Sequence, residues 1–416
     1  MTVATSALYL ADLMSRMTGL GRRAFNAEAL LKEALAGAPA TTLGGEFGPS
    51  QFMEGLVILL SALESEANLS LFGRVAVRYD TLRCLRNLIR LSREETRDPT
   101  IMATPIRRPL IVTGLPRSGT TFLHRLLDCD PRTRSPSVWQ TMAPYPPEQG
   151  PDRRIEKTER DLRAFARFSP GFRDVHPLTA RMPQECTEIT AQVFQSLRYD
   201  TTYRIPTYLA WQDAEGHNLA YRFHKRFLQH LQHQSGDDPD AVQWVLKCPD
   251  HVFALDAIRM VYPDARIVFV HRDPLKVLPS VAKLTEILRQ PFTSEQDKPE
   301  IGAQVTGRWH QGVEAMMAAA DTNGGVLGAG GTICHIHYRD LTADPLGAIN
   351  RLYQHFDMDL GTDAAAAMTV EMNRAKRGGY GRNVYRFNDH GLDARGERSF
   401  FATYMKRFGV AEEIPV

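Results

Sequence analysis

The sequence predicts an α/β protein in which a P-loop-like parallel sheet is flanked by helices, with an N-terminal helical subdomain and a helical insertion. Short apolar runs rich in β-branched residues recur in the second part of the chain, and helical stretches separate them. This alternation is typical of a parallel sheet covered on both faces. Residues before Pro105 show helical periodicity alone, and a segment of about 140–235 is mostly helical and rich in Tyr, Phe and His.

Two amphipathic helices are expected before Pro105. The first follows Ser50 and repeats apolar residues at helical spacing, at Phe52, Leu56, Leu59, Leu60 and Leu63. The second runs from about Leu69 to Arg93 and carries an apolar stripe, Val75, Leu82, Leu85, Leu88 and Leu91. We expect residues 1–104 to form a helical cap, which packs on a core or covers an apolar pocket, and residues 105–416 to form the α/β domain.

The strands of that domain are expected where the apolar runs are short and bounded by turn residues, at 107–114, 242–247, 265–272 and 332–338. Helices are expected from Thr120 onward, at 252–262 and at 274–290. The run at 107–114 ends in a glycine directly before the first of these helices, which predicts a strand–loop–helix unit.

Composition excludes several classes of protein. The 416 residues include 50 Lys+Arg and 48 Asp+Glu, so the formal net charge of +2 disfavours a global electrostatic grip on nucleic acid. The five cysteines are scattered and form no C-x-x-C pair, which disfavours a disulfide framework and a zinc ribbon. Asp12 and Arg16 interrupt any apolar N-terminal stretch. We expect a cytoplasmic protein with no signal peptide, no transmembrane segment and no nucleic-acid partner.

The strongest local signal is the segment Gly114–Thr121, which lies between a predicted strand and a predicted helix. Its frame, G-x-x-x-x-G followed by a hydroxyl residue, is that of a phosphate-cradling P-loop, whose backbone N–H groups surround an anion. The lysine that serves the phosphates of a nucleoside triphosphate is replaced by Thr120, and the cation is instead Arg117, inside the loop. The sequence therefore favours a smaller terminal anion over ATP.

These residues carry a resemblance to a known family. The stretch LPRSGTTFLHRLL resembles the 5′-phosphosulfate loop of sulfotransferases that use 3′-phosphoadenosine 5′-phosphosulfate (PAPS). The segment 265–284 strengthens it, because Arg272 ends a predicted strand and Ser280 follows in a helix capped by Asp273. In the family this Arg and Ser hold the 3′-phosphate. The loop residues that the resemblance assigns to the donor are Arg117, Ser118, Gly119, Thr120 and Thr121.

The resemblance extends over about 48–408 and is to a bacterial-type branch, the third large sulfotransferase family. HYRDLTADP resembles the segment whose tyrosine, here Tyr338, lies against the adenine. The basic, Gly-rich stretch from 373 resembles the loop that closes over the nucleotide, with Lys376, Arg377 and Gly378 as candidates for contacting the 3′-phosphate.

The implied reaction transfers a sulfuryl group from PAPS to a hydroxyl, releases PAP and requires no metal. It needs in-line positioning and stabilisation of charge on the leaving oxygen, a role for which Arg117 is suited. Several branches carry a lysine at the position of Lys247 that touches the transferring group. Two candidates for the general base stay open: His251, four residues after Lys247, and Glu185, in MPQECTEI.

The acceptor is predicted to be a small molecule, lipid-like or aromatic, because the insertion is rich in aromatic side chains that either line an apolar pocket or fill a core. They are Phe165, Phe168, Phe172, Phe194, Tyr199, Tyr203, Tyr208, Trp211 and Tyr221. Two other functions remain as alternatives. A non-catalytic PAPS or PAP sensor is favoured by Gln140, which stands where many relatives have a glutamate, whereas Thr120 argues against a P-loop nucleotide kinase. The sequence leaves a homo-oligomer open.

Overall fold

The computed structural model describes residues 24–36, 43–168, 178–321, 326–327, 331–377 and 386–414. The N-terminal helices are α2 (Ala27–Ala34), α3 (Pro49–Ser65) and α4 (Leu71–Arg97), so both helices predicted before Pro105 are confirmed. Ser70 caps α4 by accepting a hydrogen bond from the Gly73 amide. No helix within these ranges is long and apolar enough to cross a membrane.

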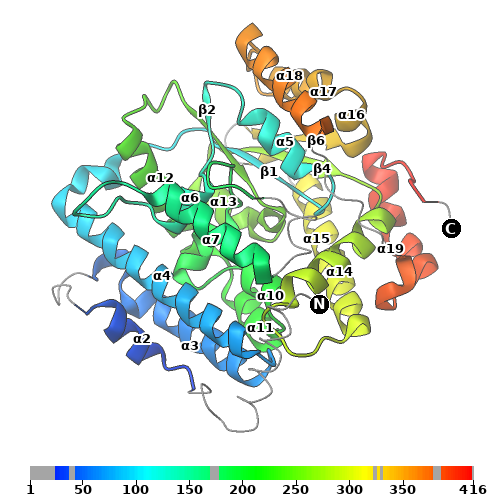
Figure 1. Ribbon diagram of the computed structural model, residues 1–416. Helices are drawn as coiled ribbons and strands as arrows, with labels where there is room; N and C mark the ends of the chain where they lie inside the picture. Colours follow the sequence, from blue (N-terminus) through cyan, green and yellow to red (C-terminus); the bar gives the residue numbers. More distant parts are fainter. Residues whose placement is uncertain are drawn as a thin grey trace.

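Within the described ranges, six strands form one sheet, in the order β2-β3-β1-β4-β6-β5 (Figure 1). They are β1 (Leu110–Gly114), β2 (Thr133–Arg134), β3 (Gln243–Lys247), β4 (Arg266–His271), β5 (Val326–Leu327) and β6 (Gly331–His337). All neighbours pair in parallel except β5, which is antiparallel to β6. The four predicted strands and the parallel sheet are confirmed. The sequence did not predict β2 and β5, because two residues are too few to show an alternating pattern.

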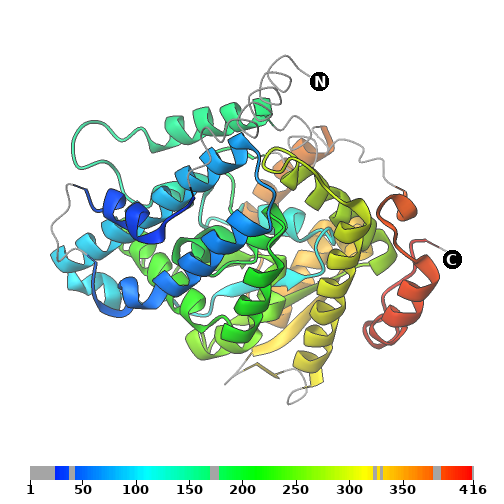
Figure 2. The same cartoon turned by 90° about the horizontal axis from the view of Figure 1, so that it is seen from below.

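The remaining helices surround this sheet (Figures 1 and 2). After β1 come α5 (Thr120–Leu127), α6 (Val138–Met142), α7 (Arg154–Phe168), α9 (Thr187–Thr190), α10 (Arg198–Thr202), α11 (Pro206–Glu215) and α12 (Asn218–Ser235). After β3 come the 3₁₀ helix η4 (Pro249–Ala254), α13 (Leu255–Val261), α14 (Pro274–Arg289) and α15 (Lys298–Asp321). After β6 come α16 (Tyr338–Ala343), α17 (Pro345–His355), α18 (Thr362–Arg377) and α19 (Ala394–Phe408).

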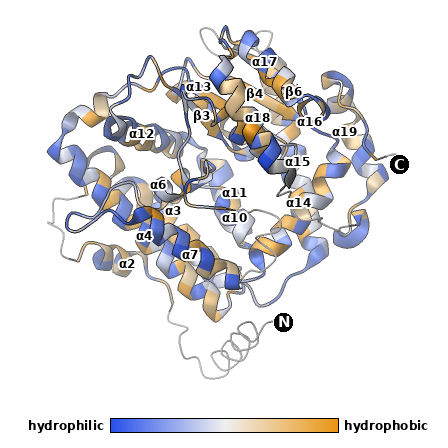
Figure 3. Ribbon diagram, turned by 45° about the horizontal axis from the view of Figure 1, so that its top comes forward, coloured by the Kyte–Doolittle hydropathy of each residue, from blue (hydrophilic) through white to orange (hydrophobic). Residues whose placement is uncertain are grey.

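Each face of the sheet packs against its own hydrophobic core, because successive strand residues point to opposite faces. Leu110 and Val112 of β1 lie in a core built with α5, α16, α17 and α18. Ile111 lies in the larger core on the other face, which the N-terminal helices, the insertion and α13–α15 share. Figure 3 shows the hydrophobic strands surrounded by helices of mixed hydropathy. The helical cap therefore packs directly on the insertion and the sheet, while its separation as a domain stays a prediction.

The path of the chain at the carboxyl end of β1 depends on Gly114. Gly114 has φ +129°, which side chains rarely tolerate, and a Cβ there would lie 2.4 Å from the carbonyl oxygen of Val270. The chain therefore leaves β1 against β4 and turns at once into the loop before α5.

Candidate functional site

The loop between β1 and α5 has the backbone of an anion-binding turn. Arg117 has φ +61° and Gly119 has φ +94°, and Gly119 is the N-cap of α5. Ser118 is buried, and its hydroxyl donates to the carbonyl oxygen of Leu115, which fixes the loop from inside. A Cβ at Gly119 would lie 3.0 Å from Cδ2 of Tyr338, so the glycine also allows the β6–α16 junction to approach. The amides that begin α5 are thereby presented at one end of the sheet.

Four predicted donor residues, from three parts of the chain, meet at this loop. Arg272 follows β4, and its Nη1 donates to the carbonyl oxygen of Arg117 at 2.7 Å. Its guanidinium lies over the ring of Tyr338, with 3.7 Å between Cζ and the ring centroid. Arg117 Nε donates to Ser280 Oγ at 3.2 Å, although Pro279 stands inside α14 directly before this serine. Ligands of parallel sheets bind at this carboxyl end of the strands.

A buried lysine joins the loop to the segment before α9. Lys247 ends β3 with its side chain 2% exposed, and its Nζ donates to Thr121 Oγ1 at 3.1 Å. The same Nζ forms an ion pair with the carboxylate of Glu185, whose side chain is 27% exposed. The Cys186 amide donates to the carbonyl oxygen of Lys247 at 3.2 Å, which fixes Glu185 beside the strand end. Loop, lysine and carboxylate therefore form one connected unit.

The second candidate base lies elsewhere. His251 belongs to η4, is completely buried, and its Nδ1 shares a hydrogen bond with the hydroxyl of Tyr221. Burial, with the charges of His224 and Lys247, holds the pKa of His251 well below its ordinary value. Glu185 lines the large cavity beside the loop, and His251 is not among the lining residues.

That cavity has a volume of about 710 Å³ and begins at the loop, where Arg117, Thr120 and Thr121 line it. Its apolar wall comes mainly from α4, α7 and α14, with Phe72, Val75, Ala76, Leu162, Phe165, Val281, Leu284, Leu288 and Phe292. Val75 and Tyr79 of α4 also line the cavity and are 60% and 50% exposed, so they mark its opening to solvent. The helical cap thus contributes one wall through Phe72, Val75 and Ala76. The other residues of the stripe predicted on 69–93 are buried in the hydrophobic core instead: Leu82, Leu85, Leu88 and Leu91.

Some aromatic side chains of the insertion line the cavity, and others fill the hydrophobic core. Phe165 and Tyr203 line the cavity. Phe194, Tyr199, Tyr208 and Tyr221 are buried in the hydrophobic core, and Trp211 packs against it. Phe172 and the side chain of Phe168 lie outside the described residues.

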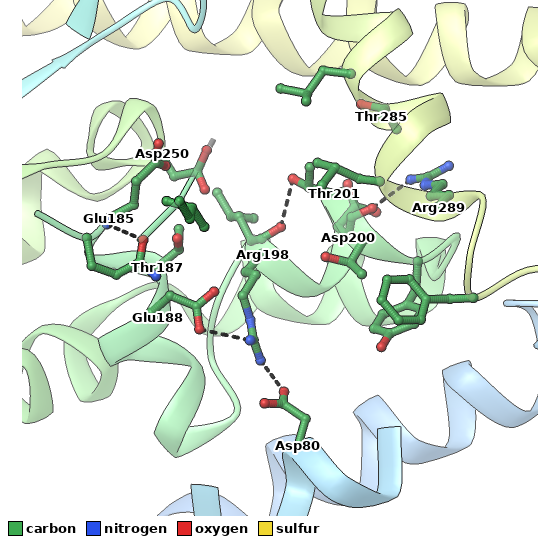
Figure 4. A pocket seen from close by; sticks show the side chains of 18 of the residues that line it. Asp80, Glu185, Thr187, Glu188, Arg198, Asp200, Thr201, Asp250, Thr285 and Arg289 are labelled. Carbon is green, nitrogen blue, oxygen red and sulfur yellow. Dashed lines mark hydrogen bonds and ion pairs between the residues drawn. The ribbon is translucent and has the colours of Figure 1, made fainter. Parts of the chain in front are cut away.

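Charged side chains of α4, α9 and α10 occupy another part of the wall. Arg198 of α10 lies between Asp80 of α4 and Glu188 of α9, with 3.0 Å from its Nη1 to Glu188 Oε2 (Figure 4). Burial opposes ionisation of Asp80, but Arg198 and Arg83 hold its pKa below the ordinary value. Near α14, burial raises the pKa of Asp200 to about 6. These contacts tie the N-terminal helices to the insertion.

Asp250 follows Lys247 and lines the cavity on the side of Glu185. Burial, reinforced by the charge of Glu185, raises the pKa of Asp250 from 3.8 to about 7. The folded protein therefore keeps a proton here that the unfolded chain releases at lower pH.

This proton makes stability depend on pH. The contribution of protonated Asp250 to the free energy of unfolding is fully present below the unfolded pKa of 3.8. It is lost as the pH rises through the folded pKa of about 7. We expect Asp250→Asn to raise the free energy of unfolding by about 1–2 kcal/mol at about pH 8 and to leave it unchanged at about pH 4. Urea unfolding at both pH values measures this, with Asp256→Asn on the exposed side of α13 as the control. Equal stability of wild type and Asp250→Asn at the higher pH would contradict it.

Three predicted donor contacts are not tested. Lys376 and Arg377 are the last two residues of α18, and their side chains are outside what the structure describes. Gly378 itself lies outside the described residues. Among the described residues, no group of three His, Cys, Asp or Glu side chains could hold a metal ion.

Comparison with known proteins places this geometry in a family. Residues 109–362 match the model of the Sulfotransferase family. The omega-hydroxy-beta-dihydromenaquinone-9 sulfotransferase Stf3 of Mycobacterium bovis and of Mycobacterium tuberculosis is 24% identical over 277 residues, 62% of this chain. That match spans 64% of the length of these relatives.

Two crystal structures have the same fold. Sulfotransferase STF1 from Mycobacterium tuberculosis H37Rv is 28% identical with a TM-score of 0.76, and the match covers 91% of this chain and 99% of that one. Sulfotransferase STF9 from Mycobacterium avium is 26% identical with a TM-score of 0.81, covering 94% and 98%. Since the family model matches more than half of the chain and includes the loop, Lys247, Arg272 and Tyr338, the chain belongs to the sulfotransferase family.

Proposed function

We propose that this chain transfers a sulfuryl group from PAPS to a hydroxyl of a small apolar acceptor and releases PAP. The observation that carries the proposal is the convergence of the β1–α5 loop, Arg272 and Ser280 at one end of a cavity that Glu185 also lines. The sequence family supports the same reaction.

The donor fits the residues at the sheet end. The loop amides and the Arg117 side chain would hold the 5′-phosphosulfate, because N–H groups at a helix start and a guanidinium both favour anions. Arg272 and Ser280 would hold the 3′-phosphate, and the tight approach of Tyr338 to Gly119 leaves its ring next to the nucleotide. As bond formation proceeds, charge collects on the leaving 5′-phosphate, which Arg117 stabilises.

Glu185 is the base in this proposal. The acceptor hydroxyl gives its proton to the Glu185 carboxylate as its oxygen bonds to sulfur, and the bond from sulfur to the 5′-phosphate oxygen breaks. Glu185 reaches the cavity and is oriented by Lys247, which also contacts Thr121 of the loop. His251 is the weaker candidate, because complete burial separates it from the cavity. Lys247 lies where it can contact both the transferring group and the base.

The walls of the cavity favour a lipid-like or aromatic alcohol or phenol. Its apolar lining from α4, α7 and α14 buries hydrocarbon, which stabilises the complex by about 25 cal/mol per Å² of apolar surface. The Mycobacterium relatives support this class, since their name describes a hydroxylated menaquinone derivative as the substrate.

Ligand binding by the wild-type protein tests the proposal. Calorimetry is expected to give PAP an affinity at least about tenfold higher than 5′-AMP or ATP, because of the three only PAP has a 3′-phosphate that can contact Arg272 and Ser280. With PAPS present, long-chain alcohols and phenols are expected to yield sulfated products. ATP binding as tight as PAP binding would favour a kinase, and PAP binding without any sulfated product would favour a sensor.

A further inference from the structure

The guanidinium of Arg272 already holds a carboxylate of its own chain. Glu413, in the segment after α19, pairs with it side-on, with 2.9 Å from Nε to Oε1 and 3.0 Å from Nη2 to Oε2. The Arg272 side chain is 15% exposed and that of Glu413 is 29% exposed. This two-point contact uses the edge with which an arginine binds a phosphate most strongly.

The segment that carries Glu413 is anchored independently of its carboxylate. Asp273, buried at the start of α14, accepts hydrogen bonds from the Glu413 amide at 2.7 Å and from the Ile414 amide at 3.2 Å. Arg398 of α19 binds the same carboxylate at 3.0 Å and donates to the carbonyl oxygen of Ile414 at 2.6 Å. The backbone at 413–414 is therefore fixed next to Arg272, and the Glu413 side chain is held at a high effective concentration.

Arg272 is likewise positioned without Glu413. Its Nη1 donates to the carbonyl oxygen of Arg117, and its plane stacks on Tyr338. The Glu413 carboxylate is thus needed neither to fix the tail nor to aim the guanidinium. The carboxylate instead places a negative charge on the Nε–Nη2 edge of Arg272. In the proposed function, this guanidinium binds the 3′-phosphate.

We propose that Glu413 tunes the affinity of the donor site for its nucleotide, as an internal competitor that the 3′-phosphate displaces from Arg272. The inference rests on the proposed function. A 3′-phosphate replaces the carboxylate as the acceptor of the Arg272 hydrogen bonds, and because it carries more negative charge it displaces the competitor. An anion that binds only the loop leaves the Arg272–Glu413 pair intact. Glu413 therefore lowers the affinity for PAP, and with it product retention, without changing the affinity for 5′-AMP.

Calorimetry on Glu413→Gln tests this inference, with Glu412→Gln as the matched control, because Glu412 is adjacent, equally charged and 3.9 Å from Arg398 rather than paired with Arg272. The expected result is a PAP affinity about two- to fivefold higher in Glu413→Gln, the size of one partly exposed ion pair, and an unchanged affinity for 5′-AMP. Glu412→Gln should match the wild type. In an Arg272→Ala background the effect of Glu413→Gln should disappear, as a direct coupling requires.

An unchanged or lower PAP affinity in Glu413→Gln would overturn the inference, a lower one meaning that the carboxylate orients Arg272. A gain shared equally by 5′-AMP would overturn it too, because it would reflect general charge. Wild-type protein that binds PAP no better than 5′-AMP would overturn the proposed function itself, and this inference with it.

Discussion

Replacing Glu185 by glutamine is expected to lower the rate of sulfuryl transfer by about 10²- to 10⁴-fold, the usual worth of a positioned general base, and to leave PAP binding within about twofold of the wild type. The amide is nearly isosteric and can still accept a hydrogen bond from Lys247, but it cannot take the proton of the acceptor. Steady-state turnover with an alcohol acceptor, together with PAP calorimetry on the same preparation, measures both quantities.

Glu188→Gln is the control for that variant. Glu188 also lines the cavity, but its carboxylate pairs with Arg198, whereas Lys247 pairs with Glu185. We expect it to lose only a few-fold in turnover. If Glu185→Gln kept nearly full activity while His251→Gln lost it with the fold intact, the general base would be His251.

Replacing Arg272 by alanine is expected to lower the affinity for PAP by about 100-fold or more, because a charged two-point contact to phosphate is removed. The affinity for 5′-AMP, which lacks the 3′-phosphate, should change by less than about threefold. Calorimetry with both ligands gives the comparison. Arg339→Ala, an exposed neighbour of Tyr338, removes the same charge without touching the loop and should behave like the wild type.

An equal loss for PAP and 5′-AMP in Arg272→Ala would argue against a 3′-phosphate site. It would mean that Arg272 acts by supporting the loop through the carbonyl oxygen of Arg117. Thermal unfolding of the variant separates this outcome from general loss of structure.

The sheet and the donor loop could be predicted because their signals are local. A strand such as β4 contains a short apolar run, 267–270, that is rich in β-branched residues. The spacing of Gly114, Arg117 and Gly119 within one turn is also visible in the sequence. The cap of α14 is predictable for the same reason, and the Asp273 side chain accepts a hydrogen bond from the Leu275 amide.

The base and the cavity could not be resolved in this way, since both depend on contacts between distant segments. From the sequence, His251 and Glu185 are equally plausible as the general base. Only the tertiary structure shows that His251 is buried against Tyr221, while Glu185 lines the cavity. Phe72 and Phe292 stack on each other across more than half of the chain, and nothing near either residue marks a pocket. The Glu413 contact has no local signature either.

The course of α14 has a consequence for how substrates are selected. Ser280, on the second turn of α14, contacts Arg117 at the donor side, while Leu284 and Leu288, on later turns, line the acceptor cavity. With a rise of about 1.5 Å per residue, Ser280 and Leu288 are about 12 Å apart along the axis. The single helix α14 thus sets how far the acceptor extends from the donor site. Side-chain size on its distal turns can therefore diverge among relatives, changing acceptor length, while the nucleotide end stays the same.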